Sequence, residues 1–178
     1  MHQVRILNHQ QLGSIPYAEH VTRWLTEDEQ RAWLSLAMLM MRLPAALEAQ
    51  LQRDSGLSHF EYQVMAGLSE QPGRVLQMSE IARLSGSSLS RLSHVVSRME
   101  QRGWVVRQRV AGPGRRTTVT LTDTGFELLA EAAPGHVAAV RAYVVDTLGE
   151  RDLARLGEAA AAILAAIDPD APSGRPSD

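Results

Sequence analysis

The 178-residue sequence predicts a mainly helical chain with one small β-hairpin, an α+β fold class. Two observations carry this prediction. Apolar residues recur at steps of three and four over most of the chain, which is typical of amphipathic helices. Residues 104–110 and 115–121 instead alternate and are rich in valine and threonine, and the Ala-Gly-Pro-Gly sequence at 111–114 between them indicates a hairpin turn.

The first helix is predicted to begin near Thr26. Residues 26–29 (TEDE) have the form of a capping box, in which a threonine and a glutamate satisfy free backbone N–H groups at a helix start. The apolar run 32–41 is interrupted by Ser35 and is far shorter than the ~20 residues that span a bilayer. We therefore expect a packing helix, with no membrane partner, that is kinked or bent near Pro44.

A second helix is predicted to start at Ser58 and to end before Gln71. Its expected core residues are Phe60, Val64, Met65 and Leu68. After the hairpin, Thr122 should cap a long helix with a kink at Pro134-Gly135, and Gly149 should separate it from the last helix. These C-terminal segments are apolar over more than one face, so a partner should cover the surplus.

A further helix is predicted from Ser88 to Arg102. Its buried stripe is expected to consist of Leu89, Leu92, Val96 and Met99. The opposite face offers hydroxyls, an imidazole and guanidiniums, which are the groups that meet base edges and phosphates in a DNA major groove. The candidate DNA-contacting residues on that face are Ser88, Ser90, Arg91, His94 and Arg98.

Gly103 is suited to end this helix, and the hairpin that follows carries Arg115 and Arg116 at its tip. A thin arginine can enter a minor groove or contact flanking phosphates where a helix cannot. The order of helix, turn, polar helix and arginine-tipped hairpin between residues 79 and 122 predicts a winged helix-turn-helix. Double-stranded DNA is therefore the expected partner.

The distribution of charge supports a DNA partner. The chain has a formal net charge of −2 and no lysine, but residues 78–120 carry eight arginines and two glutamates, a net of +6. Residues 1–77 carry a net of −2 and residues 121–178 a net of −6. The positive charge is thus concentrated on the segment that would face phosphates.

Three sequence segments resemble the multiple antibiotic resistance regulator (MarR) family of bacterial winged-helix transcription factors. They are residues 78–84 (MSEIARL), 89–105 (LSRLSHVVSRMEQRGWV) and 115–125 (RRTTVTLTDTG). With flanking helices the resemblance covers about residues 26–167. The family usually has an aspartate two residues before the arginine of the wing tip, and Pro113 stands there in this chain. Either Arg115 or Arg116 is therefore the expected wing contact.

The resemblance implies a homodimeric regulator, most simply a repressor, that binds a pseudo-palindromic operator. The absence of cysteine and of an export signal makes the cytoplasm the expected compartment. It also implies a small phenolic or amphipathic effector between the dimerisation helices and the winged lobe. The candidate pocket residues are Trp24, Trp33, Arg42, His59 and Tyr62. The expected domains are an N-terminal extension (1–25), an N-terminal dimerisation helix (26–57), the winged helix-turn-helix (58–122), C-terminal dimerisation helices (123–167) and a disordered tail (168–178).

Other functions are less well supported by the sequence. The six histidines are scattered and form no recognisable metal site, and no phosphate-binding glycine loop or serine elbow is present, so we expect no catalysis, cofactor or metal. Without cysteine, thiol-based sensing is excluded. Residues 1–20 show no export signal. Two alternatives stay open: a winged protein-docking module, and an architectural DNA-binding protein that needs no effector.

Overall fold

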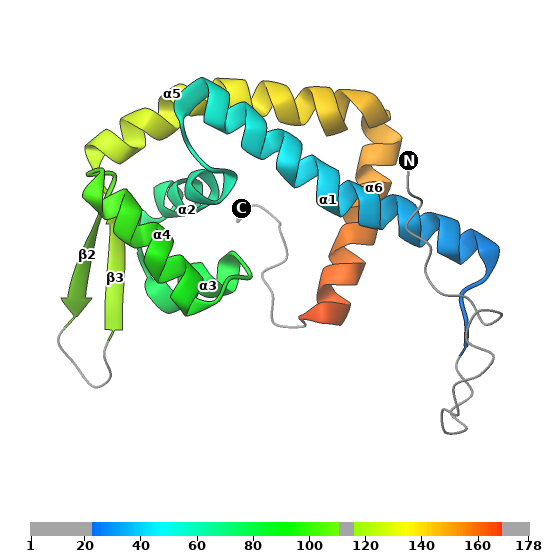
Figure 1. Ribbon diagram of the computed structural model, residues 1–178, viewed down its shortest axis with the longest axis horizontal. Helices are drawn as coiled ribbons and strands as arrows, with labels where there is room; N and C mark the ends of the chain where they lie inside the picture. The colour runs from blue at the N-terminus through cyan, green and yellow to red at the C-terminus, as the bar shows by residue number, and fades with distance from the viewer. Residues whose placement is uncertain (1–22, 111–115, 169–178) are drawn as a thin grey trace. The chain divides into compact units, whose positions relative to one another are not determined.

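The computed structural model describes residues 23–110 and 116–168 (Figure 1). The chain divides into two compact units, residues 1–45 and 46–178. Helix α1 (Glu27–Ser55) contributes to both, because the boundary lies within it. Residues 1–22 of the predicted N-terminal extension, residues 111–115 of the predicted hairpin with Arg115, and residues 169–178 of the predicted tail lie outside the described residues.

The described part of the first unit is residues 23–45, which comprise the beginning of α1 and the four residues before it. The Thr26 N–H donates to Glu29 Oε2 at 2.8 Å and the Glu29 N–H donates to Thr26 Oγ1 at 3.3 Å, which confirms the predicted capping box. The helix continues through Pro44. Many of its large apolar side chains are exposed within this chain, among them Trp33, Leu39, Met40 and Met41.

Helix α1 is also the one helix among the described residues that is long and apolar enough, by length and composition, to cross a membrane. Arg42 lies near its middle, where a bilayer would impose a large cost on an unpaired guanidinium. Pro44 follows two residues later. These two residues fit a helix that packs against protein better than one that crosses lipid.

The second unit contains the remaining elements, with the bounds that the structure gives them. They are α2 (His59–Ser69), the short 3₁₀ turn η2 (Pro72–Arg74), β1 (Val75–Gln77), α3 (Met78–Leu84), α4 (Leu89–Gln101), β2 (Val105–Val110), β3 (Arg116–Leu121), α5 (Asp123–Val140), the π-turn η3 (Arg141–Val145) and α6 (Asp146–Ile167). The order of helices and strands confirms the predicted mainly helical α+β class.

The three strands form one antiparallel sheet in the order β1-β3-β2. In the β2–β3 hairpin, Val105 pairs with Leu121 and Val110 pairs with Arg116. On the other edge of β3, Val75 pairs with Thr120. The sequence predicted the hairpin but missed β1, because a strand of three residues is too short to show an alternating pattern.

The core of the second unit lies between α2, α3, α4, α5 and the sheet, with Leu51 of α1 added. Leu92, Val96 and Met99 are fully buried, as predicted, but Leu89 is 55% exposed. The prediction for Leu89 was wrong, and Val95 is buried in its place. The reason is positional: Leu89 is the first residue of α4, and the core does not extend past the helix start.

Predicted helix ends agree with the structure at several positions. Ser58 caps α2 with a complete capping box to Glu61, and Thr122 caps α5 by accepting the Gly125 N–H at 3.0 Å. Gly103 has φ +76°, the left-handed conformation expected at a helix stop. Gly149 breaks the helical dihedrals near the start of α6, as predicted.

Helix α5 continues through Pro134 and Gly135 with helical dihedrals, and the irregular turn of the C-terminal segment lies further on, at η3. Gly135 has a specific role in this packing. A Cβ atom there would lie 3.3 Å from Gln50 Nε2 and 3.4 Å from Asp54 Oδ2, so the glycine lets α5 approach the end of α1 closely. In contrast to α5, α6 buries no residue in this chain.

Candidate nucleic-acid interface

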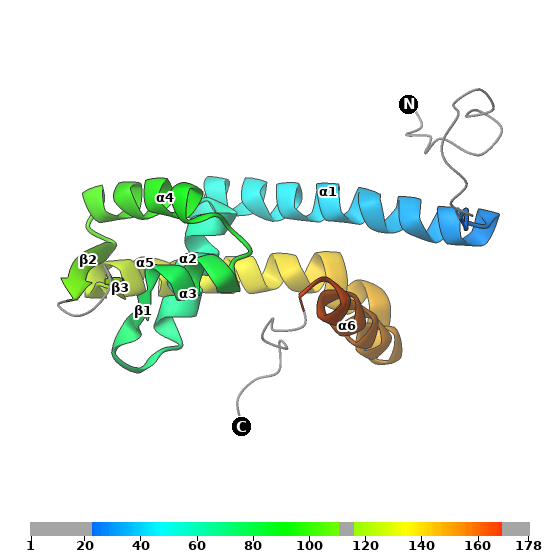
Figure 2. The ribbon, with the colours of Figure 1, turned by 90° about the horizontal axis from the view of Figure 1, so that it is seen from below.

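Helix α4 presents the polar face that the sequence predicted. The side chains of Ser88, Ser90, Arg91, His94 and Arg98 are all exposed. Figure 2 shows α2 and α3 on one side of α4, which leaves its other long side uncovered within this unit. The apolar residues that recur every three or four positions fix this orientation, because they hold the opposite face in the core.

A groove of about 680 Å³ runs beside this face. It is lined by the five predicted contact residues together with Glu48, Ser58, Phe60 and Val95. Two further features shape it: the Ser88 hydroxyl caps α4 by accepting the Arg91 N–H at 3.3 Å, and the Arg91 guanidinium carbon lies 5.2 Å from the centre of the Phe60 ring. The groove therefore combines hydroxyl groups with guanidiniums that are already partly ordered.

A second groove, of about 460 Å³, lies between α3, α4 and the hairpin. Its polar lining includes Ser79, Ser90, Ser93, Arg107 and Arg116. Arg116 is the first residue of β3 and is exposed, whereas its rival Arg115 lies outside the described residues. The two grooves share Ser90, so a basic, hydroxyl-rich surface extends from α4 to the hairpin.

Not every arginine of the +6 segment is free to bind phosphate. Arg107 is tied to Glu100, which accepts the Arg107 backbone N–H at 3.0 Å and the side-chain Nε–H at 2.8 Å. These hydrogen bonds from Arg107 lower the pKa of Glu100, so the pair stays ionised. Arg102 stacks over the Trp104 ring at 4.7 Å. Sequence reasoning counted all these charges as available because it could not see their partners.

Arg98 is also partnered. Its guanidinium lies 3.6 Å from Oε1 of Glu61, a carboxylate that is only 4% exposed. Arg98 nevertheless keeps 60% of its side-chain surface exposed, so it can meet a phosphate while compensating the buried charge. Among the described residues, Arg83, Arg109 and Arg116 form no ion pair and are exposed.

The predicted pocket residues fall into both units. Trp24, Trp33 and Arg42 belong to the first unit, where all three are exposed. His59 and Tyr62 belong to the second, and the structure brings both next to His136 of α5: its ring centre lies 4.3 Å from that of Tyr62 and 5.8 Å from that of His59.

The environment of this histidine pair disfavours charge. Burial lowers the pKa of His59 from its ordinary value, although Glu48 acts in the opposite direction. Burial and the neighbouring His59 lower the pKa of His136, and burial raises the pKa of Tyr62. Gln50 Oε1 and His136 Nδ1 are buried and make no hydrogen bond in the structure. The cluster therefore offers unused hydrogen-bonding atoms in a largely neutral setting.

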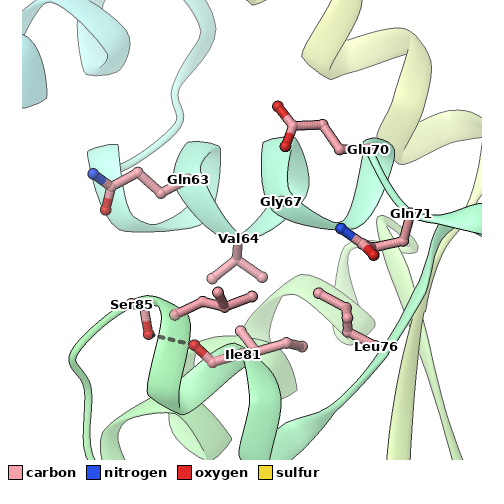
Figure 3. A pocket seen from close by; sticks show the side chains of 9 residues that line it. Gln63, Val64, Gly67, Glu70, Gln71, Leu76, Ile81 and Ser85 are labelled. Atoms are coloured by element: carbon pink, nitrogen blue, oxygen red, sulfur yellow. Dashed lines mark hydrogen bonds between the residues drawn. The ribbon is translucent and has the colours of Figure 1, made fainter. Parts of the chain in front are cut away.

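A separate hollow of about 420 Å³ lies between α2, β1 and α3 (Figure 3). Val64 and Ile81 face each other across it, and Gln63, Glu70 and Gln71 lie around its edge. The Ser85 hydroxyl donates to the Ile81 carbonyl at 2.7 Å, which satisfies this group within the end of α3. Nothing in this hollow resembles the basic lining beside α4.

Comparison with known proteins agrees with this geometry. Residues 55–116 match the MarR family. The structure resembles Sco3205 of Streptomyces coelicolor, a MarR family transcriptional regulator that was solved in complex with DNA. The two chains are 40% identical, with a TM-score of 0.81, over 84% of this chain and 93% of Sco3205. The chain belongs to the MarR family of transcriptional regulators. This finding confirms the family and the winged fold that the sequence motifs predicted.

Two other MarR relatives show the extent of the likeness. AbsC, also a MarR family regulator of Streptomyces coelicolor, is 36% identical, with a TM-score of 0.78 over 84% of this chain and 100% of AbsC. The transcriptional repressor MprA of Escherichia coli K12 is 25% identical over 111 residues. That match covers 61% of this chain and 63% of MprA, so the chain spans less than two thirds of this curated relative.

Proposed function

We propose that this MarR protein is a transcriptional regulator that binds double-stranded DNA in a sequence-specific manner. The observation that carries the proposal is the uncovered face of α4, which presents serine, arginine and histidine and no acid beside an arginine-bearing hairpin. The DNA complex of Sco3205 supports it, because that relative is 40% identical over most of both chains. Repression follows most simply, by occupation of a promoter.

Each predicted contact residue has a role in this proposal. Ser88, Ser90, Arg91 and His94 read base edges in the major groove, where an arginine can bind guanine through two hydrogen bonds. Arg98 holds a backbone phosphate, and Arg115 or Arg116 of the hairpin reaches the minor groove or its flanking phosphates. Residues 58–122 are thus the DNA-binding domain.

We further propose that the protein acts as a homodimer through residues 26–57 and 123–167. Large apolar side chains are exposed on both segments, including Met41, Val137, Leu164 and Ile167. Surfaces of this kind are rarely left open to water, and a second copy would cover them. A two-fold dimer places its reading helices about 34 Å apart and so requires a pseudo-palindromic operator.

An effector is the third part of the proposal. A small phenolic or amphipathic molecule would bind beside His59 and Tyr62, where Gln50 Oε1 and His136 Nδ1 lack partners. The sequence also predicts Trp24, Trp33 and Arg42 of the first unit as pocket residues. Binding would release DNA by favouring a separation of the two lobes that does not match the half-sites, to the extent of its differential affinity for the two states.

Fluorescence anisotropy with the DNA upstream of the protein's own gene tests the proposal. The titration is run at several salt concentrations, with unrelated DNA as the control. Preferential binding with two subunits per site is the expected result. Weak, salt-sensitive binding that is equal on both DNAs would instead indicate an architectural role, and no binding at low salt would favour a protein-docking module.

A further inference from the structure

The first turn of α2 contacts two of the arginines proposed to bind DNA. Phe60 lies under Arg91, with 5.2 Å from the guanidinium carbon to the ring centre, within the range of a cation–π contact. The next residue, Glu61, faces Arg98 at 3.6 Å. Arg91 and Arg98 are two helical turns apart on α4, so consecutive residues of α2 hold both ends of one arginine face.

This turn of α2 is itself held firmly. Glu61 Oε2 accepts hydrogen bonds from the Ser58 backbone N–H and from the Ser58 hydroxyl, both at 2.9 Å. Glu48 of α1 accepts the His59 backbone N–H at 2.6 Å. The Glu61 carboxylate uses one oxygen for the helix cap and leaves the other for Arg98. A buried carboxylate needs such partners, because removing a charge from water without compensation is costly.

We propose that Phe60 and Glu61 are positioning residues, which fix the Arg91 and Arg98 side chains for DNA recognition without touching DNA themselves. The inference rests on the proposed function. A long arginine side chain loses rotamer freedom when it binds DNA, and this loss has an entropic cost. The cost of binding is smaller when the guanidinium is already ordered in the free protein. This pre-ordering favours the operator geometry over binding to any phosphate.

The arrangement also places the histidine cluster next to the same turn. His59 and Tyr62 face His136 of α5, while Phe60 and Glu61, between them in sequence, face α4. A ligand that shifted this turn would disturb both arginine contacts together. The first turn of α2 alone therefore connects the histidine cluster to the polar face of α4.

The experiment measures a specificity ratio, the Kd for unrelated DNA divided by the Kd for a preferred site that the wild type selects from a random duplex library. Glu61→Gln keeps an oxygen for the Ser58 cap but removes the charge that holds Arg98. We expect the ratio to fall about 3- to 10-fold, as the ordering of one arginine side chain implies. The loss of a negative charge alone would strengthen binding to both DNAs similarly and leave the ratio unchanged.

Two double-mutant comparisons test whether Glu61 acts through Arg98 and Phe60 acts through Arg91. Glu61→Gln should have no further effect on the ratio in an Arg98→Ala background, and Phe60→Leu should have none in an Arg91→Ala background. Phe60→Tyr keeps the ring and should retain the wild-type ratio. Glu70→Gln removes an exposed carboxylate from the far end of α2 and serves as the matched control.

The outcomes separate the two proposals. A wild type that selects no preferred site, and so has a ratio near one, overturns the proposed function and this inference with it. A wild-type preference that Glu61→Gln and Phe60→Leu both retain overturns the inference alone. If Glu61→Gln lowers the thermal stability too far for measurement, the Phe60 and Arg91 comparison decides the question, because Phe60→Leu leaves the cap intact. Additive losses in both double mutants also overturn it.

Discussion

Gly125 should be among the least replaceable residues of the protein. It lies in the first turn of α5, where a Cβ atom would stand 2.2 Å from the Trp104 carbonyl oxygen, 2.8 Å from Leu121 Cδ1 and 3.0 Å from the Trp104 carbonyl carbon. Two of these three atoms belong to the backbone, so no side-chain rotation can relieve the contact. Gly125→Ala must therefore push the start of α5 away from the Trp104 backbone, just before β2, by about 1 Å to reach van der Waals distance.

The energetic cost follows from what that movement breaks. The Trp104 carbonyl accepts the Thr122 N–H and the Thr122 hydroxyl, each at 3.0 Å. Overpacking costs about 1–3 kcal/mol, and each weakened hydrogen bond adds about 0.5–1.5 kcal/mol. We expect the free energy of unfolding to fall by about 2–6 kcal/mol, a large part of the 5–15 kcal/mol typical of a folded protein.

Urea denaturation followed by circular dichroism, at one fixed protein concentration, measures this loss. Gly67→Ala is the matched control, because Gly67 lies inside α2, nothing lies within 4 Å of a Cβ atom there and its φ is not positive. The control should be stabilising by about 0.5–1 kcal/mol. A Gly125→Ala protein within 0.5 kcal/mol of the wild type would refute the reasoning.

Three further predictions follow from the same structure. The pKa values of His59 and His136 are lowered, so the unfolded chain binds protons first and the free energy of unfolding should fall as pH decreases below about 6.5. Replacing both by glutamine should flatten this pH dependence in urea titrations, and an unchanged slope would contradict it. In the same assay, Leu92→Ala should lower the free energy of unfolding by about 2–5 kcal/mol and Leu89→Ala by less than about 1 kcal/mol, because Leu92 is fully buried and Leu89 is exposed. Equal losses would contradict this assignment of the α4 core residues. Arg91→Ala should lose about 1–3 kcal/mol of discrimination at one base pair, measured on single-substitution operators; an unchanged site preference would remove Arg91 from the reading face.

Local sequence signals predicted the elements and their ends well. The capping boxes at Thr26 and Ser58, the stop at Gly103 and the break at Gly149 each depend on a few adjacent residues, and such signals are visible without tertiary information. The exposed face of α4 was predictable for the same reason. Leu89 was misjudged because periodicity assigns a face and does not show where the core ends.

The contacts of the site depend on residues that are distant in sequence. Glu61 and Arg98 are 37 positions apart, and His59 and His136 are 77 positions apart. No spacing rule connects such pairs, since the fold alone brings α2 to α4 and α5. Arg107 was counted as a free cation for a different reason: Glu100 is only seven positions away, but it contacts Arg107 across the turn from α4 into β2, where no helical spacing rule applies.

Thr122 has a consequence for how the hairpin could be re-engineered. Its hydroxyl donates to the Gly103 carbonyl at 2.7 Å, and its own N–H bonds to the Trp104 carbonyl, so the chain entering the hairpin and the chain leaving it are joined at one point. A segment whose two ends are fixed to each other is a natural unit for exchange between homologues. Hairpins from other MarR proteins, grafted between Trp104 and Thr122, would keep the junction with α4 and α5 intact. Such chimeras would separate the contribution of the hairpin to the choice of operator from that of α4.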